Sequence, residues 1–292
     1  MQIIMKKYED LKELFKKDAL SNAVTDCFFE IYVESRKLLS GFDKLSLTDN
    51  GTEKQYFVFT EKNTNKKSNK ISRAVNKDLF LSRDNKSIQL FFDNIKKRDF
   101  NAQTAKQLTK VCYTIAISFC CCIDLHKEND QKTPGTYFEY LMGHLIAVRL
   151  NVVPKKQIDI SSLEMRTSLP TDFIFDLGQK RPKFHVPVKT STRERVVQVW
   201  AHQRVLDGVY GTGRFLGLLT CLSETKVDRT EKSVTEICLP EQWKIYQLFI
   251  AQLKRIYYLD VPQRYNQLNS EHPPICVKPF GEFFTDITTL LA

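Results

Sequence analysis

The chain has 292 residues, enough for one large domain or two small ones around a substantial hydrophobic core. Its 44 Lys and Arg residues outnumber its 34 Asp and Glu residues, and the formal net charge of +10 at pH 7 favours a polyanionic partner such as nucleic acid. No uninterrupted apolar run is long enough for a membrane span, and residues 1–5 lead directly into charged residues instead of a signal-peptide core. Composition therefore argues against a membrane or secreted protein and favours a cytoplasmic one.

The first 130 residues are expected to be mostly helical. Apolar residues recur at three- and four-residue spacings between positions 8 and 39 and again between 78 and 125, which is typical of amphipathic helices. The polar stretch between them contains a predicted strand at 55–59. The segment 62–73 carries lysines and an arginine without an acid, and it is interpreted either as a solvated loop or as an arm that follows a phosphate backbone.

Cysteines and histidines show no pattern of a metal or redox site. The eight cysteines form no CxxC pair and no zinc-like spacing with the five histidines. Cys120, Cys121 and Cys122 lie inside the apolar segment 111–125, where free cysteine behaves as a small hydrophobic residue. We therefore expect reduced, buried cysteines, and structural roles for His144 and His185.

The breaker-rich segment 128–135 is the predicted boundary between a region at 1–130 and a second at 131–292. The second region has the pattern of a mixed α/β core with helices on both faces. Its elements are predicted as a helix at 136–150, a strand, a hairpin at 170–190, a helix at 193–208, strands at 214–222 and 234–239, and a helix at 241–258.

The predicted hairpin brings an acid and a lysine together. A register centred on its turn places Asp172 across from Lys189, and it places the competing acid Asp176 at the turn end, opposite Phe184. A carboxylate can hold a divalent cation while a lysine lies beside the attacking water or the phosphate, as in a metal-dependent phosphodiesterase. The alternative is an ordinary ion pair on an edge strand.

These residues resemble a known motif. Pro170-Thr171-Asp172 and Pro187-Val188-Lys189, on the second and third strands of an αβββαβ core, resemble the PD-(D/E)xK nuclease superfamily. The segment from Lys189 to Arg195, KTSTRER, resembles the conserved segment of type II restriction endonucleases of the EcoRII, SsoII and NgoMIV group, which read a CC…GG core. The resemblance covers roughly residues 133–222 and implies a restriction-endonuclease-like α/β fold, with a central mixed sheet flanked by helices.

The resemblance implies Asp172 and Lys189 as catalytic residues and Mg²⁺ as the cofactor. The metal ligands would be Asp172, Glu139 on the preceding helix and the backbone carbonyl of Val188. In the family a further acid follows the lysine by thirteen or fourteen residues, on the next helix. Those positions hold His202 and Gln203 here, and Gln203 is taken as the candidate donor because of its carbonyl oxygen; Asp207 lies too far along the helix.

The resemblance also implies that Arg193, Glu194 and Arg195 read DNA bases, since arginine pairs bidentately with guanine and a carboxylate accepts from the cytosine amino group. The alternative is a helix capping box formed by Ser191 and Glu194. Arginines in a first helical turn are disfavoured by the helix dipole, which favours base reading.

The implied function is Mg²⁺-dependent, sequence-specific hydrolysis of double-stranded DNA at a palindromic CCGG or CCNGG site, in the bacterial cytoplasm. A palindrome calls for a homodimer, with a tetramer as the larger option. Residues 1–130 would bind DNA or the partner subunit, and residues 131–292 would be the nuclease core. The alternatives are a structure-specific repair nuclease of the same superfamily and a catalytically inactive DNA-binding protein.

Overall fold

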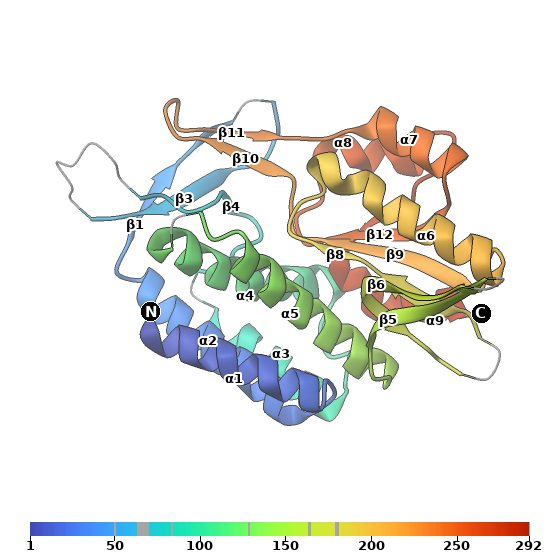
Figure 1. Cartoon of the computed structure of the whole chain (residues 1–292). Coiled ribbons are helices and arrows are strands. Elements are labelled where there is room, and N and C mark those ends of the chain that lie inside the picture. Colours follow the sequence, from blue (N-terminus) through green and yellow to red (C-terminus); the bar gives the residue numbers. More distant parts are fainter. Residues whose placement is uncertain are drawn as a thin grey trace.

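A mixed β-sheet lies between two layers of helices in the computed structural model, which describes residues 1–292 except 50, 63–69, 83, 128, 163–164, 179–180 and 292 (Figure 1). The strand order is β13 (Val277–Pro279), β12 (Leu253–Tyr258), β9 (Phe215–Cys221), β7 (Lys183–Val186), β6 (Met165–Phe175) and β5 (Lys155–Ser162), and β8 (Val188–Lys189) also pairs with β9. β5, β6 and β7 are antiparallel neighbours. β7, β8 and β12 run parallel to β9, and β13 runs parallel to β12. The predicted α/β class is confirmed.

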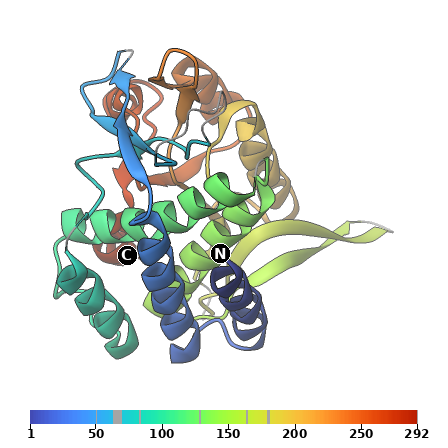
Figure 2. The same ribbon diagram turned by 90° about the vertical axis from the view of Figure 1, so that its left-hand side faces the viewer.

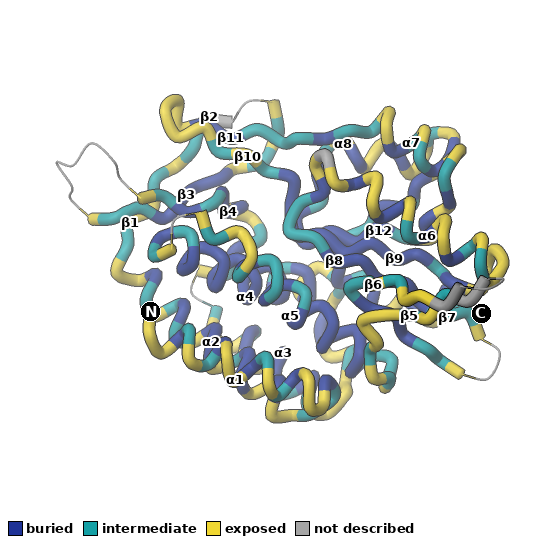
Figure 3. The backbone as a smooth tube through the Cα atoms, in the orientation of Figure 1, coloured by how far each residue is buried: buried dark blue, intermediate teal, exposed yellow. Residues whose placement is uncertain are grey.

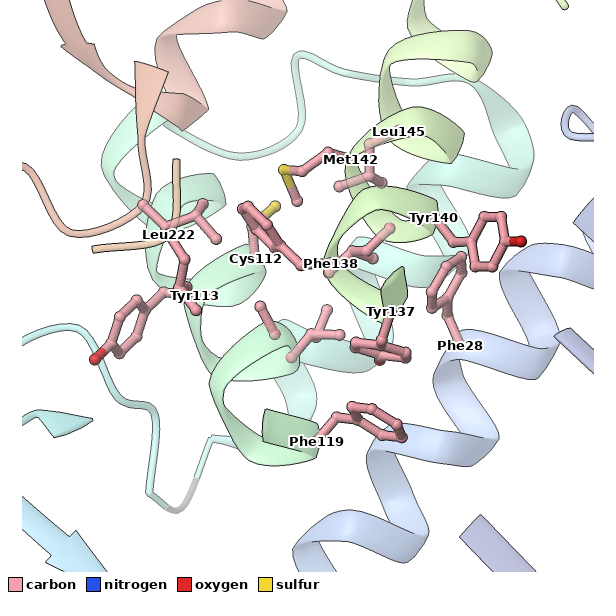
Figure 4. Packing of buried hydrophobic residues seen from close by; sticks show 14 of the residues in the cluster. Phe28, Cys112, Tyr113, Phe119, Tyr137, Phe138, Tyr140, Met142, Leu145 and Leu222 are labelled. Atoms are coloured by element: carbon pink, nitrogen blue, oxygen red, sulfur yellow. The ribbon is translucent and has the colours of Figure 1, made fainter. Parts of the chain in front are cut away.

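One face of the sheet is covered by two buried helices, α4 (Ala105–His126) and α5 (Lys132–Leu150). Figure 4 shows their side chains meeting in the centre of the largest core, where the rings of Phe119 and Tyr137 stack with centroids 4.0 Å apart. By length and composition α4 is the one helix in the described part of the chain that could cross a membrane, but it is almost entirely buried inside the fold.

The N-terminal helices α1 (Gln2–Lys17), α2 (Asn22–Leu39) and α3 (Asn85–Lys97) pack outside α4 and α5, so the predicted helices of this region are confirmed (Figure 1, Figure 2 and Figure 3). Their apolar faces join the same core as the sheet, which extends from Ile4 to Leu290. The predicted boundary at 128–135 falls between α4 and α5, which are packed together within that core.

The short strands of the N-terminal half belong to two small sheets outside the central one. β1 (Asp43–Ser46), β3 (Tyr56–Thr60) and β4 (Val75–Asn76) form one small sheet, and β2 (Thr48–Asp49) pairs with the β10 (Thr225–Asp228) and β11 (Ser233–Glu236) hairpin. Lys54 forms an ion pair of 2.5 Å with Glu236 on β11 and one of 2.8 Å with Asp260, just after β12, and so ties these strands to the central sheet.

The opposite face of the sheet is covered by α6 (Val196–Tyr210) and α7 (Pro240–Phe249), whose Trp200 and Trp243 lie in a second core. The predicted helix at 241–258 is wrong in its second half, because α7 ends at Phe249 and residues 253–258 form β12. β12 lies between β9 and β13 with Tyr257 on one core and Tyr258 on the other. Residues 253–258 are apolar enough for a helix or a strand, and they form a strand because they pair with β9 and β13 inside the sheet. Short α8 (Gln263–Asn266) and α9 (Phe283–Leu291) complete the chain.

Burial is confirmed for both histidines and for seven of the eight cysteines. All eight cysteines are free thiols, and all but Cys276 are buried. His144 is buried between the hydroxyl of Thr25 and the carbonyl of Ala19, with contacts of 2.8 and 2.7 Å, and burial lowers its pKa to about 4. His185 is also buried, and burial lowers its pKa to about 4 as well. Both imidazoles are therefore neutral parts of the interior at pH 7.

Candidate active site

The hairpin formed by β6 and β7 has a register one residue away from the predicted one. Phe173 pairs with Val186 and Phe175 with Phe184, so the ladder would place Pro187 across from Asp172. Proline has no N–H and cannot continue the ladder, and the strand is interrupted between β7 and β8. The predicted opposition of Asp172 and Lys189, and of Asp176 and Phe184, is therefore wrong as a register.

The carboxylate of Asp172 nevertheless holds Lys189. Its Oδ2 accepts a hydrogen bond from the backbone N–H of Val188 at 2.8 Å and from Nζ of Lys189 at 2.7 Å. Its Oδ1 accepts no hydrogen bond from the described residues. The interrupted strand thus lets the Asp172 side chain take the place of the missing ladder, and one carboxylate oxygen stays open to a ligand.

The carbonyl of Val188 faces the same side as Asp172. Pro187 and Lys189 direct their carbonyls toward β9, where they accept from Thr220 at 2.9 Å and Leu222 at 3.0 Å. In a strand, successive residues bond to opposite sides, and the N–H and C=O of one residue point the same way. Because the Val188 N–H donates to Asp172, its carbonyl also points toward that carboxylate.

Glu139 lies on α5, which packs against β8. Burial and then the negative charge of Asp172 raise the pKa of its carboxyl, while Lys156 and Lys189 oppose the rise. Its Oε2 lies 3.9 Å from Nζ of Lys156. The negative charge of Asp172 therefore disfavours an ionised Glu139, and a cation bound by both carboxylates would offset this effect.

A cavity of about 270 Å³ opens over the Asp172 and Lys189 side chains. Its other wall is one side of α6, formed by Gln198, Val199 and His202. Burial lowers the pKa of His202, and the nearby ammonium of Lys189 lowers it further, while Asp172 opposes both. The structure thus brings His202 into the site.

Gln203 does not line this cavity. It is buried, its carbonyl oxygen contacts Nδ1 of His185 at 3.0 Å, and its amide nitrogen donates to Asp207 and to the carbonyl of Phe215, each at 3.0 Å. Adjacent residues on a helix point about 100° apart, so one of positions 202 and 203 had to turn away. The spacing of Gln198 and His202, one helical turn apart, is the sequence signal that could have identified His202.

The predicted base-reading residues lie just after Lys189. Arg193 and Arg195 are exposed and belong to a 3₁₀ turn, η1 (Arg193–Arg195); the side chain of Glu194 lies outside the described residues. The N-cap residue of η1 is Thr192, and its side chain makes no capping hydrogen bond. The helix α6 begins only at Val196, and the side chain of its N-cap residue, Arg195, makes none either. Ser191 is therefore not a helix cap, and that part of the capping-box alternative is wrong.

A second, polar cavity of about 390 Å³ adjoins this segment. It lies between the segment at Thr190, Ser191 and Arg193 and the walls formed by Lys127 and Lys226. The predicted basic arm at 62–73 lies largely outside the described residues. Arg73, at its end, pairs with Asp124 through Nε at 2.7 Å and Nη2 at 2.8 Å, and so anchors the segment to α4.

The donors present suit a hard divalent cation. Within the described ranges, no group of three or more His, Cys, Asp or Glu side chains forms a ready-made metal cage. Mg²⁺ does not need one, because it keeps several waters and binds through one or two carboxylates together with substrate phosphate. Asp172, Glu139 and the Val188 carbonyl supply oxygen donors of that kind.

Comparisons with known proteins place this geometry in a known fold. No family model matches the chain, and no curated protein matches it. Among solved structures, the type IIP restriction endonuclease Kpn2I matches with a TM-score of 0.82 and 25% sequence identity, covering 100% of this chain and 98% of that chain. The restriction endonuclease PspGI, solved as a complex with substrate DNA, matches with a TM-score of 0.42 and 15% identity over 71% of this chain and 92% of that chain. The match to Kpn2I shows that the chain has a restriction-endonuclease fold over its whole length.

Proposed function

We infer that this chain is a type II restriction endonuclease, an enzyme that hydrolyses DNA at specific sites. The full-length likeness to a type IIP enzyme supports this activity. The observation that assigns this activity to particular residues is the hydrogen bonding of Asp172 to both Val188 and Lys189 beneath an open cavity. The net charge of +10 suits a DNA partner.

We propose that Asp172, Glu139 and the Val188 carbonyl hold Mg²⁺ in the reaction. When bound, the cation supplies Lewis-acid stabilisation of the negative charge that develops on the phosphoryl group and the leaving oxygen. Asp172 has Oδ1 available for this while Oδ2 stays bonded to the protein. Burial and the negative charge of Asp172 raise the pKa of Glu139, and a bound cation would offset both effects.

Lys189 is the positive group of the site. Its bond to Asp172 holds the ammonium at the cavity wall, where a phosphate oxygen or the attacking water would lie. A fixed positive charge there stabilises negative charge in the transition state without reorganising solvent. His202 and Gln198, on the facing wall, add polar groups that can orient water and the scissile phosphate.

The proposed target is a palindromic site with a CC…GG core, of the CCGG or CCNGG type, cut by a homodimer. The segment that contains Arg193 and Arg195 lies between the catalytic lysine and α6, exposed to a partner. Arginine recognises guanine through O6 and N7 in the major groove, and two-fold protein symmetry matches a palindrome. Base recognition and cleavage would then be carried by one continuous stretch of chain.

The test is a digest of a sequenced plasmid. With Mg²⁺ we expect discrete fragments whose ends map to one palindromic sequence, and with EDTA we expect intact plasmid, because the cation is needed to stabilise the transition state. Run-off sequencing of the fragments would identify the site and the cut position. A smear would instead indicate a structure-specific or non-specific nuclease, and tight binding without cleavage in Mg²⁺ or Mn²⁺ would indicate an inactive DNA-binding protein.

Glu139→Gln should raise the Mg²⁺ concentration needed for half-maximal cleavage by about tenfold or more, because an amide oxygen replaces an ionised ligand. Glu241→Gln is the matched control, since it makes the same change in an exposed carboxylate on α7 that pairs with Lys244. We expect the control to keep the wild-type Mg²⁺ requirement. Equal Mg²⁺ titrations for Glu139→Gln and wild type would exclude Glu139 as a ligand.

A further inference from the structure

A buried carboxylate lies under the segment that links catalysis to base reading. Glu224, just after β9, is 1% exposed, and Thr192, which precedes η1, is 2% exposed. The Thr192 N–H donates to Oε1 and Oε2 of Glu224 at 2.8 and 3.1 Å, and its hydroxyl donates to Oε1 at 2.6 Å. The hydroxyl of Tyr258, on β12, donates to the same Oε1 at 2.8 Å. Glu224 therefore ties the segment to two strands of the central sheet.

The neighbours of Glu224 hold the same segment at two more places. The N–H of Ser223 donates to the carbonyl of Thr190 at 3.2 Å, and Nη2 of Arg193 donates to the carbonyl of Thr225 at 3.2 Å. Residues 223–225 thus bind residues 190–193 through a backbone hydrogen bond, the carboxylate of Glu224 and the guanidinium of Arg193. Only Thr190, Ser191 and Thr192 separate Lys189 from Arg193, so the position of Thr192 sets how the two charged residues lie relative to each other.

Arg193 adopts an uncommon backbone conformation. Its φ of 36° is positive, in a region that residues with a side chain seldom occupy. Such a conformation persists where surrounding contacts over-determine it, and it is frequent at functional sites. The hydrogen bonds from Thr192 to Glu224 and from Arg193 to Thr225 are contacts of that kind. They hold the residue before this backbone conformation and the side chain of Arg193 itself.

A buried acid at this position is not explained by stability. Burial raises the pKa of Glu224, and the hydrogen bonds from Thr192 and Tyr258 oppose that rise. A well-packed apolar residue often stabilises a core as well as or better than a buried charged group does. The carboxylate does what an apolar side chain cannot, because it accepts both donors of Thr192 at once and so fixes its orientation as well as its position.

We propose that Glu224 is a positioning residue for sequence discrimination, which acts through Thr192 to hold Arg193 and Arg195 at a set place relative to Lys189. This inference rests on the proposed function. When the segment shifts, the arginines no longer meet the bases while Lys189 is at the scissile phosphate. Loosening this link therefore lowers the preference for the correct site more than it lowers cleavage itself.

Two matched variants test the inference. Thr192→Val removes one hydrogen bond to Oε1 of Glu224 on the side of the recognition segment, and Tyr258→Phe removes one hydrogen bond to the same atom on the side of the sheet. The measurement is the ratio of kcat/KM on the cognate oligonucleotide duplex to kcat/KM on duplexes with one base pair changed. We expect this ratio to fall about tenfold in Thr192→Val and to stay near the wild-type value in Tyr258→Phe, while the two variants lose similar amounts in Tm.

Ratios that change equally in the two variants, or in neither, would overturn the inference and leave Glu224 as a structural residue. Glu224→Gln provides a second measurement: an amide has one acceptor oxygen in place of two, so we expect its ratio to fall at least as far as that of Thr192→Val. A wild-type ratio near one would overturn the proposed function and this inference together. Discrete cleavage by wild type with an unchanged Thr192→Val ratio would overturn this inference alone.

Discussion

Asp172→Ala and Lys189→Ala should each reduce the rate of DNA cleavage by at least about 1,000-fold while specific DNA binding is largely retained. The aspartate variant loses an oxygen donor for the cation and also the acceptor that holds both Lys189 and the Val188 N–H. The lysine variant loses the positive charge at the cavity wall. Single-turnover cleavage of a plasmid measures the rate, and a gel-shift assay in Ca²⁺ measures binding.

The hairpin itself contains the control. Asp176 and Lys183 form an ion pair of 2.7 Å, the same length as the pair of Asp172 and Lys189, but at the turn end of the two strands. Because a partly exposed ion pair contributes at most about 1 kcal/mol, Asp176→Ala should cleave at nearly the wild-type rate. Cleavage by Asp172→Ala at the rate of the Asp176→Ala control would exclude the proposed active site.

Arg193→Ala and Arg195→Ala should each weaken discrimination at the base pair that the arginine reads by about 1–3 kcal/mol, because a bidentate contact with guanine is lost. Cleavage of oligonucleotide duplexes that differ by one base pair measures this discrimination. The effect should fall on particular positions of the site instead of on all sequences equally.

Arg214→Ala is the matched control for these variants. Arg214 is an exposed arginine directly before β9, whereas Lys189 pairs with Cys221 at the other end of that strand. This change removes the same charge far from the proposed site, so the cutting pattern should be that of wild type. Unchanged patterns in both Arg193→Ala and Arg195→Ala would instead assign them to holding η1 in place.

The sequence by itself determined the fold class and predicted that Asp172 and Lys189 lie together. Helical spacing in the N-terminal half predicted α1 to α4, because amphipathic helices bury one regular stripe. The alternation of strands and helices after residue 131 predicted the mixed α/β core, in which β7 and β9 pair in parallel. Asp172 and Lys189 were identified from residue type and hairpin placement, and the structure brings them within 2.7 Å.

Tertiary structure decided which neighbours those residues have. Pro187 broke the ladder, so the contact between Asp172 and Lys189 arises from a side chain that replaces a strand partner and not from register. The direction in which α6 lies on the sheet turned His202 toward the cavity and Gln203 into the interior, which residue type cannot decide. Glu224, thirty-two residues after Thr192, left no local pattern, because its partners are set by the order of the strands. Local periodicity depends only on neighbouring residues and can be recognised in the sequence. Contacts across a sheet depend on how the whole chain packs, so only the folded structure defines them.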